Sequence, residues 1–170
     1  MEHTMKVIAR IHSDFPEKFG IPRQSGLVPA LRAKIVFEPE YRNPDALRGI
    51  EGFSHLWLIW QFSAAVRDTW SPTVRPPRLG GNERVGVFAT RSPFRPNAIG
   101  LSCVKLEGVR HEDGLGDVLI VSGADLMDGT PVITGTAIDG KGAKSTFTAI
   151  PYYAFGNRGN GGYRVWLPTR

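Results

Sequence analysis

Cysteine is almost missing from this chain. The single cysteine among 170 residues, Cys103, excludes an intramolecular disulfide and any zinc site built from several cysteines. We expect it to be a buried, unreactive thiol in a reducing compartment. The four histidines do not have the close spacing of metal ligands, so no metal site is predicted; they are His3, His12, His55 and His111.

Long apolar runs are also missing. The longest, Leu56–Trp60, is far shorter than the about 20 residues that a membrane-spanning helix needs. Residues 1–15 mix charged with apolar side chains, so they lack the apolar core of a signal peptide. We therefore expect a soluble cytoplasmic protein.

Two common nucleotide-binding motifs do not occur in the sequence. No stretch matches the dinucleotide fingerprint G-x-G-x-x-G or the phosphate loop G-x-x-x-x-G-K-[ST]. The chain is therefore not expected to be a Rossmann-fold enzyme or a P-loop NTPase.

Glycine and proline, by contrast, are abundant, with 20 and 13 residues. Both destabilise helix interiors, so a helical bundle is disfavoured. Residues 53–62 form the most apolar stretch of the sequence, which predicts a strand buried on both faces. One short helix is expected at 43–48, where Asn43 and Pro44 form a typical helix start. Further strands are expected at 5–11, 34–37, 84–90, 99–106 and 118–122, which together predict a mainly all-β fold, a small barrel or a sandwich.

The net charge of +5 is unevenly distributed. Residues 67–95 carry a net +4, and every basic residue there is an arginine, whereas residues 96–135 carry a net −4. Arginine binds phosphate and carboxylate through a planar, bidentate group, which favours anion recognition. A solvated basic face is the open alternative.

Three loop segments combine chain-breaking residues with polar side chains: 19–24, 75–97 and 125–131. Prolines hold such loops in place at a low entropic cost, which is typical of a binding site.

These segments also carry a resemblance to a known family. The runs Lys18-Phe-Gly-Ile-Pro-Arg-Gln24, Glu51-Gly-Phe-Ser-His-Leu-Trp57, Arg75-Pro-Pro-Arg-Leu-Gly-Gly-Asn82, Gly86-Val-Phe-Ala-Thr-Arg-Ser-Pro-Phe-Arg-Pro-Asn97 and Asp125-Leu-Met-Asp-Gly-Thr-Pro131 resemble the TsaA-like (TrmO) family. The resemblance extends over about residues 7–132. It implies a small single-sheet β-barrel with one or two short helices, working as a homodimer with its cofactor near the subunit interface.

The activity that the resemblance implies is methyl transfer from S-adenosylmethionine (AdoMet) to tRNA. The acceptor is N6 of threonylcarbamoyladenosine at position 37, beside the anticodon of threonine tRNA. The residues chosen as catalytic are Asp128 and Arg91: chemically, Arg91 or Arg23 suits the AdoMet carboxylate, and Asp128 suits either the sulfonium or the proton of the substrate amine. The cofactor contacts fall on Pro22, Arg23, Gln24, Arg91, Leu101 and Val132, and the arginines and asparagines suited to tRNA are Arg75, Arg78, Asn82, Arg84, Arg95 and Asn97.

Several of these residues have a structural alternative. His55 is expected to be a hydrogen-bonded structural histidine more than a catalytic base. Trp57, Trp60 and Phe62 are expected in the core or a dimer interface more than under a nucleobase. Asn82 and Asn97 follow Gly-Gly and Pro, so a turn role is equally open, and Asp128 before Gly129 is also typical of a tight turn.

The sequence departs from the family in two places. Ser63-Ala64 stands where a polar pair is common, and residues 133–136 differ from the usual continuation, which puts the last barrel strand in question. The alternative function is therefore a non-catalytic nucleotide- or RNA-binding barrel. We expect a barrel domain at 1–135 and an atypical tail at 136–170, of which 145–168 resembles the closing segment of family 127 glycoside hydrolases.

Overall fold

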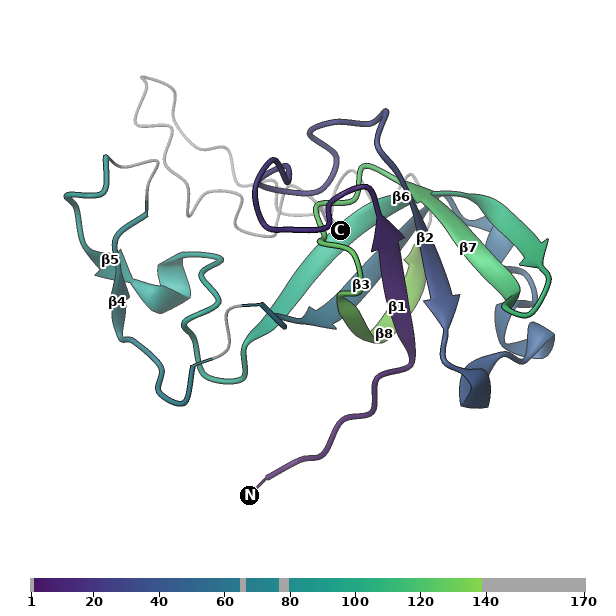
Figure 1. Ribbon diagram of the computed structural model, residues 1–170, viewed down its shortest axis with the longest axis horizontal. Coiled ribbons are helices and arrows are strands. Elements are labelled where there is room, and N and C mark those ends of the chain that lie inside the picture. The colour runs from purple at the N-terminus through teal and green to yellow at the C-terminus, as the bar shows by residue number, and fades with distance from the viewer. Residues whose placement is uncertain (1, 65–66, 77–79, 139–170) are drawn as a thin grey trace, which may run out of the picture. The chain divides into compact units, whose positions relative to one another are not determined.

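The computed structural model describes residues 2–64, 67–76 and 80–138. The chain divides into two compact units, a barrel unit from residues 1–64 and 99–140 and a second unit that includes residues 65–98. We call the second one the hairpin unit, and we describe each unit by itself (Figure 1).

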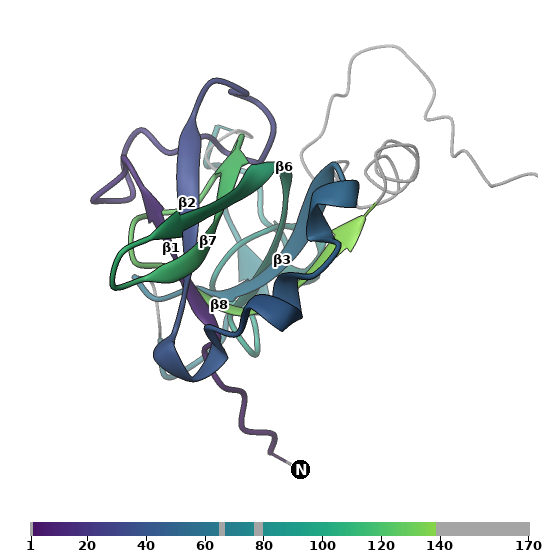
Figure 2. The ribbon, with the colours of Figure 1, turned by 90° about the vertical axis from the view of Figure 1, so that its right-hand side faces the viewer.

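Six antiparallel strands form the barrel unit, in the order β1-β2-β7-β6-β3-β8, and the sheet closes on itself. Figure 2 shows these strands curving around a common interior. The all-β prediction and the single-sheet barrel are thus confirmed. The strands are β1 (Ala9–Ser13), β2 (Arg32–Phe37), β3 (His55–Gln61), β6 (Ile99–Glu112), β7 (Gly116–Ser122) and β8 (Pro131–Ile138).

Strand β3 shows how the sequence builds the barrel wall. Leu56, Leu58 and Trp60 are buried, whereas the residues between them are only partly buried, so alternate side chains face the interior. The strand that we expected to be buried on both faces is covered fully on its inner face but only partly on its outer face.

Strand β1 begins later than its sequence predicted, at Ala9, and it continues to Ser13. The polar Ser13 extends the strand because its hydroxyl donates a hydrogen bond to the carbonyl of Leu126 at 2.8 Å. A hydrogen-bond acceptor from a distant part of the chain thus satisfies the polar side chain of Ser13 within the strand.

Strand β6 is 14 residues long and joins two sides of the barrel. Its first half pairs with β3 and its second half with β7. The register shifts between Leu106 and Gly108, and Gly108 has a φ of 151°. Glu107 lies at this bulge, and its carboxylate accepts a hydrogen bond from the Ser122 hydroxyl at 2.6 Å.

Strand β8 closes the barrel by pairing with β1 and with β3. The unusual residues 133–136 therefore form a barrel strand, which the sequence had left in question. The strand ends at Ile138, so the first three residues of the expected tail belong to it. The division at 135 stays a prediction, and the segment 145–168 lies outside the described residues.

Three short 3₁₀ helices follow β2: η1 (Pro39–Tyr41), η2 (Pro44–Leu47) and η3 (Ile50–Gly52). Helix η2 confirms the helix expected at 43–48, and the Asn43 side chain accepts a hydrogen bond from the Asp45 N–H at 3.0 Å. Residues of this helical segment and of the barrel strands line a largely apolar cavity of about 360 Å³.

The hairpin unit contains the short strands β4 (Thr73–Val74) and β5 (Val85–Gly86), followed by the 3₁₀ helix η5 (Val87–Ala89). The strand expected at 84–90 was therefore wrong beyond Gly86. The chain turns there because the Val87 N–H bonds the Pro72 carbonyl at 3.0 Å and the Thr90 hydroxyl bonds the Val87 carbonyl at 2.8 Å. No helix within the described ranges is long and apolar enough to cross a membrane.

Candidate functional site

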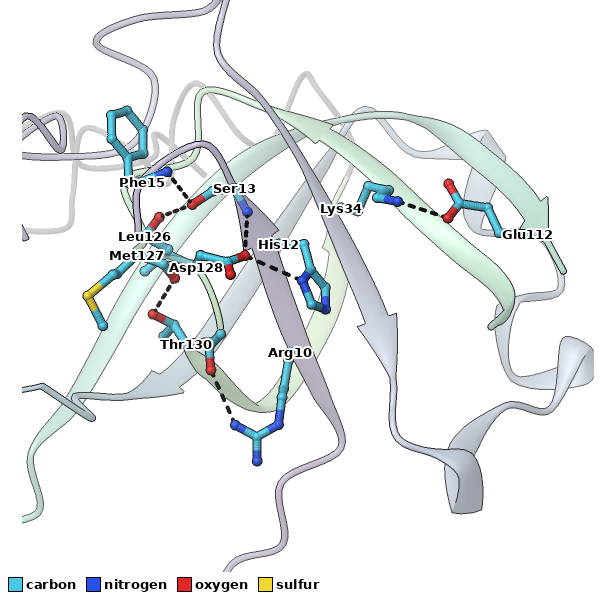
Figure 3. Close-up of polar contacts among 11 residues, drawn as sticks. Arg10, His12, Ser13, Phe15, Lys34, Glu112, Leu126, Met127, Asp128 and Thr130 are labelled. Atoms are coloured by element: carbon cyan, nitrogen blue, oxygen red, sulfur yellow. Dashed lines mark hydrogen bonds and ion pairs between the residues drawn. The ribbon is translucent and has the colours of Figure 1, made fainter. Parts of the chain in front are cut away.

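The turn between β7 and β8 is tied to the end of β1. The Asp128 N–H donates to the Phe15 carbonyl at 2.8 Å. The Ser13 hydroxyl donates to the Leu126 carbonyl (Figure 3). Two hydrogen bonds thus hold residues 125–131, one of the three polar loop segments of the sequence, against the start of the loop that contains residues 19–24.

Asp128 is held by its side chain as well. Its Oδ1 accepts the Ser13 backbone N–H at 3.1 Å and lies 3.3 Å from His12 Nδ1 (Figure 3). Its side chain is 45% exposed, so the carboxylate is anchored by one oxygen while still reaching solvent. The geometry fits the turn role that the Asp-Gly sequence indicated, and it leaves the carboxylate open to a ligand.

The loop that carries Pro22, Arg23 and Gln24 is joined to strand β6 and to the β7–β8 turn. The hydroxyl of Ser25 accepts the Cys103 N–H at 3.2 Å. The Gly26 N–H donates to the Gly123 carbonyl at 2.8 Å. These two hydrogen bonds hold the loop against strand β6 and against the β7–β8 turn.

Gly123 is required for this contact. A Cβ at Gly123 would lie 3.1 Å from the backbone of Gly26, and the φ of Gly123 is +71°. A side chain would push the two loops apart and would also strain the backbone. The close approach of the two loops therefore depends on glycine.

A buried chain of hydrogen bonds joins the barrel interior to the same turn. The Trp60 indole N–H donates to the Ser102 hydroxyl at 2.9 Å, which donates to Asp125 Oδ1 at 2.7 Å. Trp60 and Ser102 are buried, whereas Asp125 is partly exposed. The core thus positions the first aspartate of the Asp125–Pro131 motif.

The barrel unit therefore brings together three segments that the sequence placed in a cofactor site. Arg23 is exposed, and Pro22 and Gln24 are partly buried. Leu101 projects from β6 with 36% exposure, one residue before Ser102. Val132, by contrast, is 1% exposed and lines the cavity inside the barrel.

A family model described as the tRNA-methyltransferase O N-terminal domain matches residues 10–134. The chain belongs to this family. A relative in Escherichia coli K12, named tRNA (adenine(37)-N6)-methyltransferase, is 51% identical over 127 residues, which cover 74% of this chain and 53% of the relative. A Pseudomonas aeruginosa protein, named a putative S-adenosylmethionine-dependent methyltransferase, is 50% identical over 133 residues, covering 78% of this chain and 53% of that protein.

Solved structures agree with this assignment. A crystal structure of TrmO from Pseudomonas aeruginosa matches with a TM-score of 0.66 at 39% identity, over 84% of this chain and 58% of that chain. Another crystal structure of TrmO gives 0.65 at 40% identity, over 81% and 58%. The chain spans about half the length of the curated relatives it matches.

In this TrmO-family domain, the arginines of the hairpin unit are not equivalent. Arg75 and Arg84 are exposed, as is Asn82, whereas Arg91 is partly buried. Arg95 donates from Nε to the Ser92 carbonyl at 3.0 Å and from Nη2 to the carbonyls of Val87 and Thr90. Arg95 therefore holds the fold of its loop, and Arg78 lies outside the described residues.

Local geometry also describes the surroundings of Asn97, His55 and Cys103. Asn97 has a φ of 51°, which is a turn conformation. His55 is hydrogen-bonded to the Ser54 hydroxyl at 2.8 Å, and burial and Lys105 lower its pKa, which fits a structural histidine. Cys103 is buried, as expected, and burial raises the pKa of its thiol to about 12, which is consistent with an unreactive thiol.

Trp60 is a core residue, as the sequence favoured, and its ring meets that of Phe62 edge-on with centroids 4.4 Å apart. The sequence predicted no role in the site for three residues that hold it together: Ser25, Ser102 and His12. Ser102 carried a usable signal, since it is a polar residue inside an apolar strand pattern. Among the described residues, no group of His, Cys, Asp or Glu side chains is arranged to hold a metal ion.

Proposed function

We propose that this chain transfers a methyl group from AdoMet to N6 of adenine 37 in tRNA. The substrate we propose is the threonylcarbamoyl-modified adenosine of threonine tRNA. Family membership and the names of the relatives from Escherichia coli and Pseudomonas aeruginosa support the reaction. A relative from Pyrococcus abyssi, 35% identical, is named a probable S-adenosyl-L-methionine-binding protein, which supports the methyl donor.

The observation that carries the proposal is the joining of the family's motif segments in the barrel unit. Ser25, beside Pro22–Gln24, binds Cys103, and Asp125 binds Ser102. Both bonds reach strand β6 within two residues of Leu101, at Ser102 and Cys103. The motif segments are far apart in the sequence, and these bonds hold them together.

The residues present fit AdoMet chemically. The molecule carries an adenine ring, a sulfonium cation and a carboxylate. Arg23 is an exposed cation for the carboxylate, and Leu101 is an exposed apolar side chain for the ring. Asp128 is an exposed carboxylate that suits either the sulfonium or the N6 proton, and we assign it to the proton. We also assign a carboxylate-binding role to Arg91.

AdoMet, when bound, supplies an electrophilic methyl group on its sulfur. The exocyclic nitrogen of adenine is a weak neutral nucleophile, because its lone pair is delocalised into the ring. Catalysis by the protein then depends on positioning and on an acceptor for the N6 proton. Asp128 suits that role, since Ser13 and His12 anchor one carboxylate oxygen and leave the group partly exposed.

The substrate is rich in negative charge, because the threonylcarbamoyl group adds a carboxylate to the phosphates of the anticodon loop. Arg75 and Arg84 are exposed on the hairpin unit and suit these anions. We assign tRNA contacts to Arg78, Asn82 and Asn97 as well. Arg95 contributes by fixing its loop, since its guanidinium is bonded to backbone carbonyls.

We further propose that two copies associate through the outer face of β3 and β6. Trp57 and Ile59 on β3 are partly buried, and Leu101 opposite Ile59 is exposed, so apolar side chains lie side by side on this face. A dimer through Leu101 also places the cofactor segment near the interface. The tRNA substrate implies a cytoplasmic location.

The alternative function, a barrel that binds nucleotides or RNA without turnover, rested on the replaced segment after Val132, which put the last barrel strand and its cofactor contacts in question. Strand β8 forms and closes the barrel by pairing with β1 and β3, with a register shift between Ile59 and Trp60. The pairing of β8 supports an intact barrel, and together with the named relatives it favours methyl transfer over the alternative.

Calorimetry with AdoMet, followed by methyl incorporation into threonine tRNA, tests the proposal. We expect binding at micromolar AdoMet and transfer only to tRNA that carries threonylcarbamoyladenosine, with unmodified transcript as the control. Cofactor binding without transfer would restore the non-catalytic alternative. Absence of AdoMet binding at high micromolar concentration would refute the proposed methyltransferase activity.

A further inference from the structure

The hairpin unit exposes two stacked aromatic rings. The centroids of Trp70 and Phe88 are 6.1 Å apart, and their planes differ by 23°. Trp70 is 50% exposed and Phe88 is 73% exposed. Side chains of this size are usually buried, so a stacked and exposed pair indicates a binding surface more than a packing role.

The backbone beside each ring is fixed by hydrogen bonds. Ser71, next to Trp70, donates its N–H to the Phe94 carbonyl at 2.9 Å. Val87, next to Phe88, is 1% exposed and donates its N–H to the Pro72 carbonyl. The two rings therefore project from anchored backbone, which preserves their stacking at low entropic cost.

Guanidinium groups lie in the same small unit. The Arg67 guanidinium carbon lies 3.8 Å from the centroid of the Phe94 ring. Arg84 Nη1 donates to Thr73 Oγ1 at 3.3 Å, which holds this exposed arginine at the strand that follows Trp70. Residues 67–95 carry six arginines against two acidic residues. The surface thus combines flat apolar rings with positive charge.

We propose that Trp70 and Phe88 form a platform on which an unpaired RNA base stacks. This inference rests on the proposed function and deepens it, because it assigns base recognition to two residues that have no role in cofactor binding. Single-stranded nucleic acid is bound by aromatic rings that stack on bases and by cations that follow the phosphates. The charge around the pair favours this occupant over an apolar protein segment.

The test compares two RNA probes of equal charge on the full chain. One is a fluorescent ten-nucleotide oligo(A), and the other has the same backbone without bases. Wild-type protein is expected to bind the base-bearing probe about tenfold more tightly, the scale of one aromatic stack. Trp70→Ala and Phe88→Ala are each expected to remove most of this preference and to leave binding of the abasic probe unchanged.

Two variants serve as controls. Trp70→Phe retains a ring and is expected to retain the preference, which shows that the Ala variants fail through lost stacking. Phe53→Ala removes an exposed aromatic ring from the barrel unit and is expected to change nothing. Three results would each overturn the platform. The first is a wild-type protein that binds both probes equally well. The others are an Ala variant that weakens binding of both probes equally and a change of oligomeric state in Trp70→Ala.

The outcome separates this inference from the proposed function. AdoMet binding and methyl transfer to threonine tRNA are measured on the same wild-type preparation. A protein that prefers the base-bearing probe but does not transfer methyl groups refutes the proposed function and retains the platform. A protein that methylates tRNA while Trp70→Ala and Phe88→Ala bind both probes like wild type refutes the platform alone.

Discussion

The indole of Trp60 lies directly against Gly100 inside the barrel. A Cβ built on Gly100 would lie 2.3 Å from Cε2 and Cζ2 of that ring. Gly100→Ala must therefore displace a buried ring that is also hydrogen-bonded to Ser102. We expect the free energy of unfolding to fall by about 1–3 kcal/mol, the usual cost of overpacking a core.

Urea unfolding measures this change, and Gly52→Ala is its control. An added Cβ at Gly52 meets no atom within 4 Å, and the residue lies in the same unit. The control is expected to be near neutral. Equal unfolding midpoints for Gly100→Ala and wild type would show that the Trp60 indole moves aside without any loss of stability.

Ser102 provides a second prediction. Ser102→Ala leaves the buried Trp60 N–H without its acceptor and removes the donor to Asp125. An unsatisfied buried donor costs about 1–3 kcal/mol, and we expect a loss of stability in that range. Thermal and urea unfolding check it, with the exposed Ser63→Ala as control. A loss limited to a few tenths of a kcal/mol would show that water replaces the hydroxyl.

Local patterns explain why part of the fold was predictable. The apolar run of β3 and the Asn43-Pro44 start of η2 determine their structure through neighbouring residues, and both were predicted close to their observed bounds. Strand β8 was not predictable, because its sequence departs from the family and its residues are defined by pairing with β1 and β3. Such pairing joins distant segments: Leu56 and Ala137, for example, are partners although they are more than 70 residues apart in the sequence.

The site shows the same division. The residue types of Pro22–Gln24 and Asp125–Pro131 marked both loops as functional segments on the sequence. The bonds that join them, from Ser25 to Cys103 and from Asp125 to Ser102, could not be inferred, because nothing in either segment specifies its partner. Sequence also could not distinguish Arg95, which bonds backbone carbonyls, from the exposed Arg84.

Glu107 makes stability depend on pH. Hydrogen bonds from Ser122, Lys105 and Arg32 lower the pKa of its carboxyl from 4.5 to about 2 in the folded protein. The folded state therefore favours the ionised form, and this contribution is complete above pH 4.5 and is lost as pH falls through about 2. We expect Glu107→Gln to reduce stability at pH 6 and to make little difference near pH 2.

Urea unfolding of both proteins between pH 2 and pH 6 gives the comparison. Glu51→Gln, which removes an exposed carboxylate elsewhere in the barrel unit, is the control. If the stability difference between wild type and Glu107→Gln were constant over this range, the bulge carboxylate would not be a source of the pH dependence.

Arg84 and Arg95 are expected to respond differently to substitution. Arg84→Ala removes an exposed charge, so we expect weaker tRNA binding and a salt dependence of log Kd that is flatter by about 0.7–0.9 for one lost phosphate contact. Arg95→Ala removes donors to the carbonyls of Ser92 and Val87, so we expect protease cleavage within residues 67–98. Titrations at several salt concentrations and limited proteolysis distinguish the two. A steeper or unchanged salt slope in Arg84→Ala would exclude its phosphate contact.

Asp128 can be tested for charge separately from structure. Asp128→Asn retains an oxygen that accepts the Ser13 N–H, so the turn and its bond to Phe15 are expected to persist. The amide, however, is a far weaker proton acceptor than the carboxylate. We expect single-turnover methyl transfer to fall by about 10²–10⁴-fold, the scale of general-base catalysis, with the thermal stability close to wild type. Asp128→Ala, which also loses the Ser13 bond, is expected to be inactive and less stable. Full activity in Asp128→Asn would assign Asp128 to the turn alone, and the acceptor of the N6 proton would then be a different group.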